Sequence, residues 1–186
     1  EGLCHLHSLG MVHRDLKPTN VFIGVDSHAK IGDFGCAVIV DPGKHGSDLM
    51  TDQTGSPAYM SPECASGDPY HGFRSDVYSL GATLYHCLFG RVPYEAPNTV
   101  ALFDMIADAG EVDLMPRGAA LDPQLTALLR KCLARDPRSR ATARQLLEDE
   151  WLTDEGRSAM TVWRKLPTLS TKLSRRELAN AIQQRD

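Results

Sequence analysis

The sequence has no apolar run that approaches the roughly 20 residues a membrane-spanning helix needs. It begins with neither a signal peptide nor an initiator methionine, so we expect a fragment of a longer protein. It also has no excess of basic charge, because 24 acidic residues outnumber 20 basic ones and the net charge is -4. That balance indicates neither a nucleic-acid-binding surface nor a membrane-binding one.

The cysteines are odd in number and form no C-x-x-C pair, which argues against a disulfide framework and a zinc site. They are Cys4, Cys36, Cys64, Cys87 and Cys132. We interpret them as reduced thiols and expect a cytoplasmic protein. With 186 residues, 42% of them hydrophobic, the chain is long enough for one globular domain with its own core.

Apolar residues at helical spacing predict a mainly helical fold. From Val77 to Gly90 the sequence carries no Asp, Glu, Lys or Arg, and its apolar residues follow the i, i+3, i+4, i+7 pattern. We therefore expect a helix that is buried on most sides, opened by Asp76 and ended by Gly90 and Pro93. Further helices are predicted over 2–9, 98–109, 122–134 and 141–149.

Two short apolar segments, 21–24 and 29–32, are predicted to form a β-hairpin around a tight turn at Asp26. Residues 41–57 are rich in Gly, Asp, Ser, Thr and Pro and show little periodicity, which predicts a long loop. Long loops inside compact domains are usually functional or disordered.

Three segments suggest the chemistry. His13-Arg14-Asp15-Leu16-Lys17-Pro18-Thr19-Asn20 lies between the first helix and the hairpin, Asp33-Phe34-Gly35 follows the second hairpin strand, and Ser61-Pro62-Glu63 closes the long loop. In this order they resemble the H-R-D-x-x-x-x-N, D-F-G and A-P-E segments of protein kinases. The first segment alone has six fixed positions, and a chain of this length is expected to contain on the order of 10⁻⁶ matches to them by chance.

The resemblance covers residues 1–152 and implies the large, C-terminal lobe of a kinase, a helical bundle with small β-hairpins at the catalytic cleft. Residues 153–186 would be a basic C-terminal tail. Lys17 resembles serine/threonine kinases, which transfer the γ-phosphoryl group of ATP to a hydroxyl group of a protein substrate. Ala58-Tyr59-Met60 and Trp151 resemble the calcium/calmodulin-dependent kinase kinases.

The resemblance also implies roles in the reaction. Magnesium takes hard oxygen ligands, and Asn20 and Asp33 would supply an amide oxygen and a carboxylate. Asp15 would face the incoming hydroxyl group, and Lys17 would reach the transferring phosphate as a point charge. Phe22 would lie beneath the adenine ring of ATP.

Other positions would support this site. Asp76 would hold the backbone of the segment around Asp15. Arg140 would pair with Glu63, either in the interior or as a surface ion pair of little energetic worth.

Ser56 and Pro57 resemble the segment that faces the substrate hydroxyl group. His13 and Phe34 resemble members of a hydrophobic spine that links the two kinase lobes, and Gly35 completes its motif.

Regulation is suggested by Arg14, because kinases with this arginine often need negative charge on the long loop. Thr51 and Thr54 are candidate phosphorylation sites. Our hypothesis is that Asp52 supplies part of that charge permanently; the alternative is a solvated loop acid.

No G-x-G-x-x-G occurs in the sequence, so the small ATP-gripping lobe is missing and the fragment alone is expected to be inactive. Two alternatives to an active kinase are a pseudokinase or scaffold and a dominant-negative truncated product.

The tail could bind calmodulin or another regulatory partner, although a floppy basic tail is the simpler interpretation. His5 and His7 are interpreted as helix-surface histidines, and Cys36 as a packed small residue rather than a reactive thiol.

Overall fold

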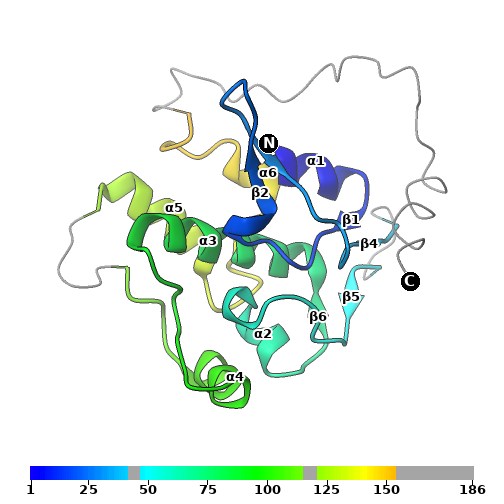
Figure 1. Ribbon diagram of the computed structural model, residues 1–186, viewed down its shortest axis with the longest axis vertical. Coiled ribbons are helices and arrows are strands. Elements are labelled where there is room, and N and C mark those ends of the chain that lie inside the picture. Colours follow the sequence, from blue (N-terminus) through cyan, green and yellow to red (C-terminus); the bar gives the residue numbers. More distant parts are fainter. Residues whose placement is uncertain (42–46, 115–120, 154–186) are drawn as a thin grey trace.

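The computed structural model describes residues 1–41, 47–114 and 121–153 (Figure 1). Predictions for the C-terminal tail beyond residue 153, including calmodulin binding, lie outside the described residues. The helices are α1 (Gly2–Ser8), α2 (Pro62–Ala65), α3 (Gly72–Phe89), α4 (Thr99–Asp108), α5 (Pro123–Leu133) and α6 (Ala143–Leu146). The strands are β1 (Met11–Val12), β2 (Val21–Ile23), β3 (Ala29–Ile31), β4 (Val38–Ile39), β5 (Leu49–Met50) and β6 (Tyr70–His71). The predicted mainly helical fold with small hairpins is confirmed, and no helix in these ranges has the length and apolarity to cross a membrane.

Helix α3 runs through the middle of the fold, with α5 packed against it (Figure 1). Val77 and Ala82 are fully buried, as the uncharged stretch predicts. Gly81 lets the two helices approach closely, since a Cβ atom there would lie 2.7 Å from the Cβ of Cys132. Gly90 ends α3 at φ 67°, a left-handed conformation that glycine adopts without steric cost.

The main core lies between α1, α3, α5 and α6. Its buried apolar residues include Leu3, Val77, Tyr85, Leu125, Leu129, Leu133 and Leu146. Burying each side chain of this size stabilises the fold by about 1.5–3 kcal/mol before the entropy cost of ordering the chain. A smaller cluster under the long loop contains Val12, Met50, Met60, Cys64 and Tyr70.

Three two-stranded antiparallel sheets position the loops. The predicted hairpin is present as β2 and β3, with Val21 opposite Ile31. Strand β1 pairs with β4, which returns the chain after Asp33 to the segment that precedes Asp15. Strand β5 pairs with β6 and thereby ties the long loop to the N-terminal end of α3.

Two predicted boundaries were wrong. Helix α3 begins at Gly72, so that Asp76 lies in its second turn instead of opening it. The helix predicted over 141–149 is restricted to α6, which starts at a capping box formed by Thr142 and Gln145.

Candidate active site

The loop of residues 13–20, which we name the catalytic loop after the role predicted for Asp15, is shaped by one buried carboxylate on α3. Asp76 is 1% exposed, and its two oxygens accept hydrogen bonds from the backbone N–H groups of His13 and Arg14, both at 2.8 Å. These bonds hold Arg14 at φ 64°, a left-handed conformation that costs a non-glycine residue about 1–2 kcal/mol. Asp76 thereby fixes the direction in which Asp15 leaves the loop.

His7 on α1 is a further partner of Asp76. Its Nε2 atom lies 3.0 Å from Oδ2 of Asp76, and its side chain is 13% exposed. The prediction of a surface histidine was therefore right for His5, which is exposed, and wrong for His7. The sequence contained a signal for the burial of His7. The apolar Leu3, which is buried, lies four positions before His7, and residues four apart share one face of a helix.

Asp15 is the centre of a hydrogen-bond network that joins the catalytic loop to the end of the long loop. One of its carboxylate oxygens accepts the backbone N–H of Ser56 at 2.9 Å. The other lies 2.8 Å from Nζ of Lys17 and accepts Nδ2 of Asn20 at 3.2 Å. Lys17 also donates to the Oγ of Ser56 at 2.7 Å. Four residues selected from the sequence thus come together at one point.

The network keeps Asp15 ionised at neutral pH. Partial burial raises the pKa of this carboxyl, but the hydrogen bonds from Lys17 and Ser56 and the charge of Lys17 outweigh burial, so the pKa lies below its ordinary value. The hydrogen bond to Asp15 likewise raises the pKa of Lys17. A carboxylate of low pKa is suited to orient a hydroxyl group rather than to remove its proton in advance.

Asp33 lies at φ 58°, at the start of a segment that contacts the catalytic loop. The backbone N–H of Gly32 donates to the carbonyl oxygen of Asn20 at 2.9 Å. Nε2 of the fully buried His13 lies 3.0 Å from the carbonyl oxygen of Gly32. The rings of His13 and Phe34 meet edge to face, with centroids 5.4 Å apart. These contacts bring the Asp33 segment beside the Asp15 loop.

Asn20 and Asp33 have oxygens that could hold a magnesium ion. Asn20 uses its Nδ2 group to bond Asp15, and its amide oxygen accepts no hydrogen bond within the described residues. Asp33 is exposed, and one of its oxygens accepts the N–H of Gly35 at 3.3 Å. The hydrogen bond to Asp15 and the charge of Asp15 raise the pKa of Lys17, and the charge of Asp33 acts in the same direction to a smaller extent.

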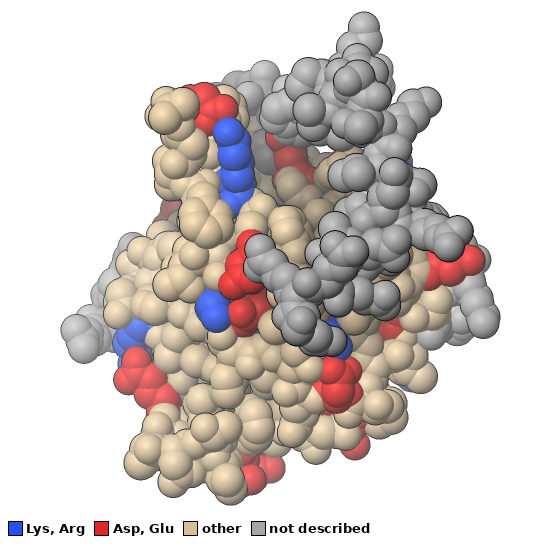
Figure 2. Space-filling model, turned by 45° about the vertical axis from the view of Figure 1, so that its right-hand side comes forward, with Lys and Arg blue, Asp and Glu red and all other residues tan. Residues whose placement is uncertain are grey.

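No group of three or more His, Cys, Asp or Glu side chains within residues 1–41, 47–114 and 121–153 could hold a metal by itself. The amide oxygen of Asn20 and the carboxylate of Asp33 are hard oxygen ligands of the kind that magnesium takes when it is bound together with phosphate oxygens. On the face shown in Figure 2, acidic and basic side chains are interspersed rather than gathered in a patch of one sign.

Phe22 lies at the edge of the site on strand β2. Its ring packs over Gly32, where a Cβ atom would lie 2.7 Å from it, and the residue is 56% exposed. Ile23 and Val25 are exposed on the same hairpin. This apolar surface next to Asp33 is available for contact with a planar ligand or another part of the protein.

The end of the long loop is held against the catalytic loop and α3. Gly55, at φ 115°, approaches so closely that a Cβ atom would lie 2.2 Å from the carbonyl oxygen of Arg14. Pro57 begins the short 3₁₀ helix Pro57–Tyr59, and the hydroxyl group of Ser79 donates to the carbonyl oxygen of Tyr59 at 2.8 Å. Ser56 and Pro57 are therefore positioned by the catalytic loop on one side and by α3 on the other.

Arg14 joins the segment after Asp33 and the long loop to the catalytic loop. Its Nε donates to the carbonyl oxygen of Cys36 at 2.6 Å, and its Nη1 donates to Asp52 at 2.7 Å. The hydroxyl group of Thr54 donates to the same carboxylate, and the hydroxyl group of Tyr70 donates to the backbone oxygen of Asp52 at 2.9 Å. The hydrogen bond from Thr54, followed by the charge of Arg14, keeps the pKa of Asp52 below its ordinary value despite some burial.

Two further positions that were chosen from the sequence are Thr51 and Cys36, and their surroundings differ from each other. Thr51 is exposed and makes no side-chain hydrogen bond within the described part of the chain. Burial raises the pKa of the Cys36 thiol, with the charges of Asp15 and Asp33 acting in the same direction. The reactive thiolate is therefore disfavoured, in keeping with the interpretation of Cys36 as a packed residue.

Glu63 on α2 and Arg140 form a bidentate ion pair, with N–O distances of 2.6 and 3.0 Å. The side chain of Arg140 is fully buried and that of Glu63 is 12% exposed. Arg140 also donates to the carbonyl oxygens of Arg74, Ala134 and Arg135. The pair therefore ties the end of the long loop to the segment before α6.

Comparisons with known proteins agree with this geometry. The family model described as protein kinase domain matches residues 1–152. The chain is 38% identical over 148 residues to the serine/threonine-protein kinase GIN4 of Saccharomyces cerevisiae, which covers 79% of this chain and 12% of that protein. It is 38% identical over 152 residues to the serine/threonine-protein kinase stk11 of Xenopus laevis, and 36% identical over 152 residues to STK11 of Homo sapiens. Both alignments cover 81% of this chain and 34% of the relative, so the chain spans about a third of their length.

Proposed function

The chain belongs to the protein kinase domain family, and on that premise we propose that it forms the large lobe of a serine/threonine kinase. The whole protein would transfer the γ-phosphoryl group of ATP to a hydroxyl group of a protein substrate. The observation that carries this proposal is the meeting of Asp15, Lys17, Asn20 and Ser56 beside the Asp33 segment.

Each residue has a chemical task in this proposal. Asp15 orients the substrate hydroxyl group and accepts its proton as the bond to phosphorus forms. Lys17, held 2.8 Å from Asp15, places a positive charge where the transferring phosphoryl group gathers negative charge. Asn20 and Asp33 would hold magnesium, which neutralises charge on the phosphate oxygens when it is bound.

The substrate side of the site would be formed by Ser56 and Pro57. Lys17 contacts the hydroxyl group of Ser56, and the backbone N–H of Ser56 contacts Asp15, so a peptide backbone that pairs with this segment would bring its hydroxyl group to both. This arrangement supports a serine or threonine acceptor, whose short side chain fits a site so close to the backbone.

A second lobe would complete the nucleotide site. The exposed ring of Phe22, packed over Gly32, is suited to lie under the adenine base, and no glycine-rich phosphate loop is present in the 186 residues. The protein would therefore need its small lobe for ATP binding, and the predicted inactivity of this piece alone follows from that. Membership of the calcium/calmodulin-dependent kinase kinase subgroup and a regulatory role for the tail stay predictions.

The competing proposal is a pseudokinase or scaffold. A protein of that kind needs no network of Asp15, Lys17, Asn20 and Ser56. The observed contacts keep Asp15 ionised and Lys17 charged, and they leave the amide oxygen of Asn20 available to a ligand. We therefore favour an active kinase. A dominant-negative product would bind kinase partners without transferring phosphate.

The proposal is tested with the full-length protein, a serine/threonine peptide library and radiolabelled ATP. Asp15→Asn should lower phosphotransfer by about 10²–10⁴-fold, the range that a positioned acid or base contributes. Asp26→Asn, in the exposed hairpin turn, is the matched control and should keep wild-type activity. Equal rates for the Asp15→Asn and wild-type proteins would contradict a kinase mechanism.

A further inference from the structure

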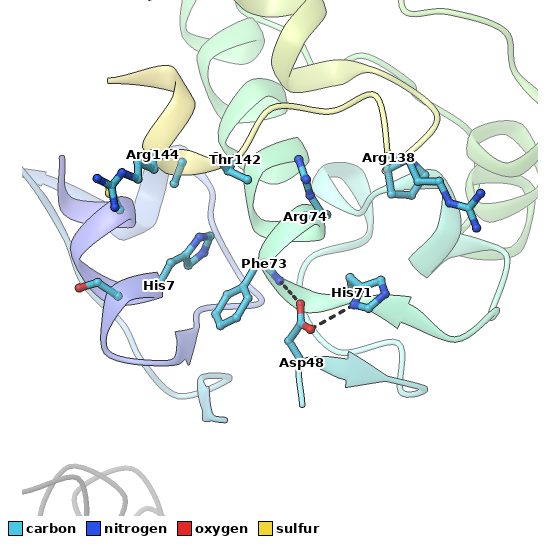
Figure 3. A pocket seen from close by; sticks show the side chains of 12 residues that line it. His7, Asp48, His71, Phe73, Arg74, Arg138, Thr142 and Arg144 are labelled. Atoms are coloured by element: carbon cyan, nitrogen blue, oxygen red, sulfur yellow. Dashed lines mark hydrogen bonds and ion pairs between the residues drawn. The ribbon is translucent and has the colours of Figure 1, made fainter. Parts of the chain in front are cut away.

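A cavity of about 600 Å³ lies on the part of the molecule where α1, the start of α3 and the start of α6 meet (Figure 3). Its volume falls within the range of about 300–1,000 Å³ that small-molecule sites occupy. None of the residues assigned to the phosphoryl-transfer site lines it. It is therefore a separate feature that the proposed reaction does not explain.

Part of the cavity wall is apolar and aromatic. The rings of His7 and Phe73 lie against each other, with centroids 4.8 Å apart, and Figure 3 shows both side chains directed to the same space. Cys4 and Ala143 add further apolar surface from α1 and α6. Such a wall favours a ligand with a flat apolar body.

The charged part of the wall has an excess of positive charge. Arg74, Arg138 and Arg144 line the cavity, and none forms an ion pair with a carboxylate among the described residues. Among the described residues that line the cavity, the one carboxylate is that of Asp48, which accepts hydrogen bonds from the ring of His71 at 3.0 Å and from a backbone N–H at the start of α3. The chain as a whole carries a net charge of -4, whereas the described lining of the cavity has three arginines and one carboxylate.

We propose that this cavity binds a small organic anion with an aromatic body, such as an aromatic carboxylate or phosphate. A guanidinium group bonds planar carboxylates and phosphates in a forked manner and also stacks on aromatic rings. The ring pair of His7 and Phe73 would contact the apolar body, and Arg144, which Figure 3 shows on the same side of the cavity as His7, would bind the anionic group. Arg138 lies at the opposite end and adds positive charge. Arg74 contributes charge but is already bonded to the carbonyl oxygen of Arg140.

The cavity is connected to the catalytic loop by one residue. His7 lines the cavity with its ring and bonds Asp76, and Asp76 holds the backbone N–H groups of His13 and Arg14. A ligand that shifts the ring of His7 changes the support of Asp15. The inferred effect on catalysis rests on the proposed function, whereas the binding site itself does not.

Binding is measured by isothermal titration calorimetry of the full-length protein, without ATP, using 2-naphthoate as the probe. Its cationic counterpart, 2-naphthylmethylammonium, has the same ring system and the opposite charge. We expect 2-naphthoate to bind at least about tenfold more tightly than the cation, and Arg138→Gln/Arg144→Gln to remove that preference. Arg130→Gln, an exposed arginine on α5 outside the cavity, is the matched control and should bind like the wild type. Equal affinity for the two probes, or an unchanged affinity in the double variant, would overturn the proposal.

The position of the probe is tested by alkylation of cysteine with iodoacetamide, followed by mass spectrometry. Saturating 2-naphthoate should slow labelling of Cys4, which lines the cavity, and leave the exposed Cys87 unaffected. Equal labelling of Cys4 with and without the probe would place the ligand elsewhere and overturn the site.

The connection to catalysis is tested by phosphotransfer rates at saturating probe. A change of about twofold or more in the wild type, absent in the double variant, supports it; an unchanged rate overturns it. Loss of the proposed function would appear separately, as equal rates for the wild type and Asp15→Asn, and would leave the binding result intact.

Discussion

The ion pair between Glu63 and Arg140 gives the most quantitative prediction about stability. Glu63→Gln keeps the shape of the side chain and one acceptor oxygen but removes the charge that faces a fully buried guanidinium group. Arg140 would retain its hydrogen bonds to the carbonyl oxygens of Arg74, Ala134 and Arg135. The variant therefore isolates the effect of leaving a buried positive charge without its carboxylate.

The magnitude follows from burial. Removing one partner of a buried ion pair typically costs about 3–5 kcal/mol. Because three carbonyl dipoles remain around Arg140, we expect the lower end, about 3 kcal/mol. This is a large share of the roughly 5–15 kcal/mol by which a folded domain is stable. With a dependence on urea of about 2 kcal/mol per molar, the unfolding midpoint should fall by about 1.5 M.

The assay is equilibrium unfolding in urea, followed by circular dichroism and tryptophan fluorescence to check that the two transitions coincide. Lys30→Gln is the matched control, because Lys30 and Asp26 form an ion pair of 3.4 Å whose side chains are 61% and 49% exposed. An exposed pair of this kind contributes up to about 1 kcal/mol, so the control should move the midpoint by at most about 0.5 M. If Glu63→Gln shifts the midpoint no further than Lys30→Gln, the reasoning from burial is refuted.

Three further predictions concern the long loop and the core. Asp52→Asn should lower the phosphotransfer rate of the full-length protein by up to about fivefold. The reason is that the substitution weakens a half-exposed ion pair with Arg14, and such a pair contributes about 0.2–1 kcal/mol. An unchanged rate would show that Asp52 does not supply permanent negative charge on the long loop. The pKa of Asp52 is lowered in the folded state, so its stabilising effect is present above the unfolded value of about 4 and is lost as pH falls through the folded value. Urea midpoints of the wild type and Asp52→Asn should therefore converge below about pH 4, and a constant difference from pH 2 to 7 would contradict this assignment. Gly81→Val should destabilise the fold by about 1–3 kcal/mol, because the added side chain overpacks against α5. Gly110→Ala is the control and should leave the urea midpoint nearly unchanged, since no atom lies within 4 Å of its added Cβ atom. Equal urea midpoints for the two variants would be inconsistent with the close contact between α3 and α5.

The sequence determined the type of fold through local patterns. The uncharged, apolar-periodic stretch after Asp76 predicted the buried helix α3, and the two short apolar segments on either side of the turn at Asp26 predicted the hairpin of β2 and β3. The ends of the helices were harder to predict from the sequence. The short α6 depends on the capping box of Thr142 and Gln145, and the early start of α3 depends on the pairing of β5 with β6, a contact between segments that are distant in sequence.

The sequence by itself also determined which residue types could carry the chemistry, because the spacing of Asp15, Lys17 and Asn20 within one short segment is a local property. Only the tertiary structure decided how they are arranged. The N–H of Ser56 meets Asp15 across 41 positions of sequence, and Asp76 reaches the catalytic loop across more than 60. Such contacts depend on how packed helices and paired strands return the chain to one place, and no local pattern encodes that return.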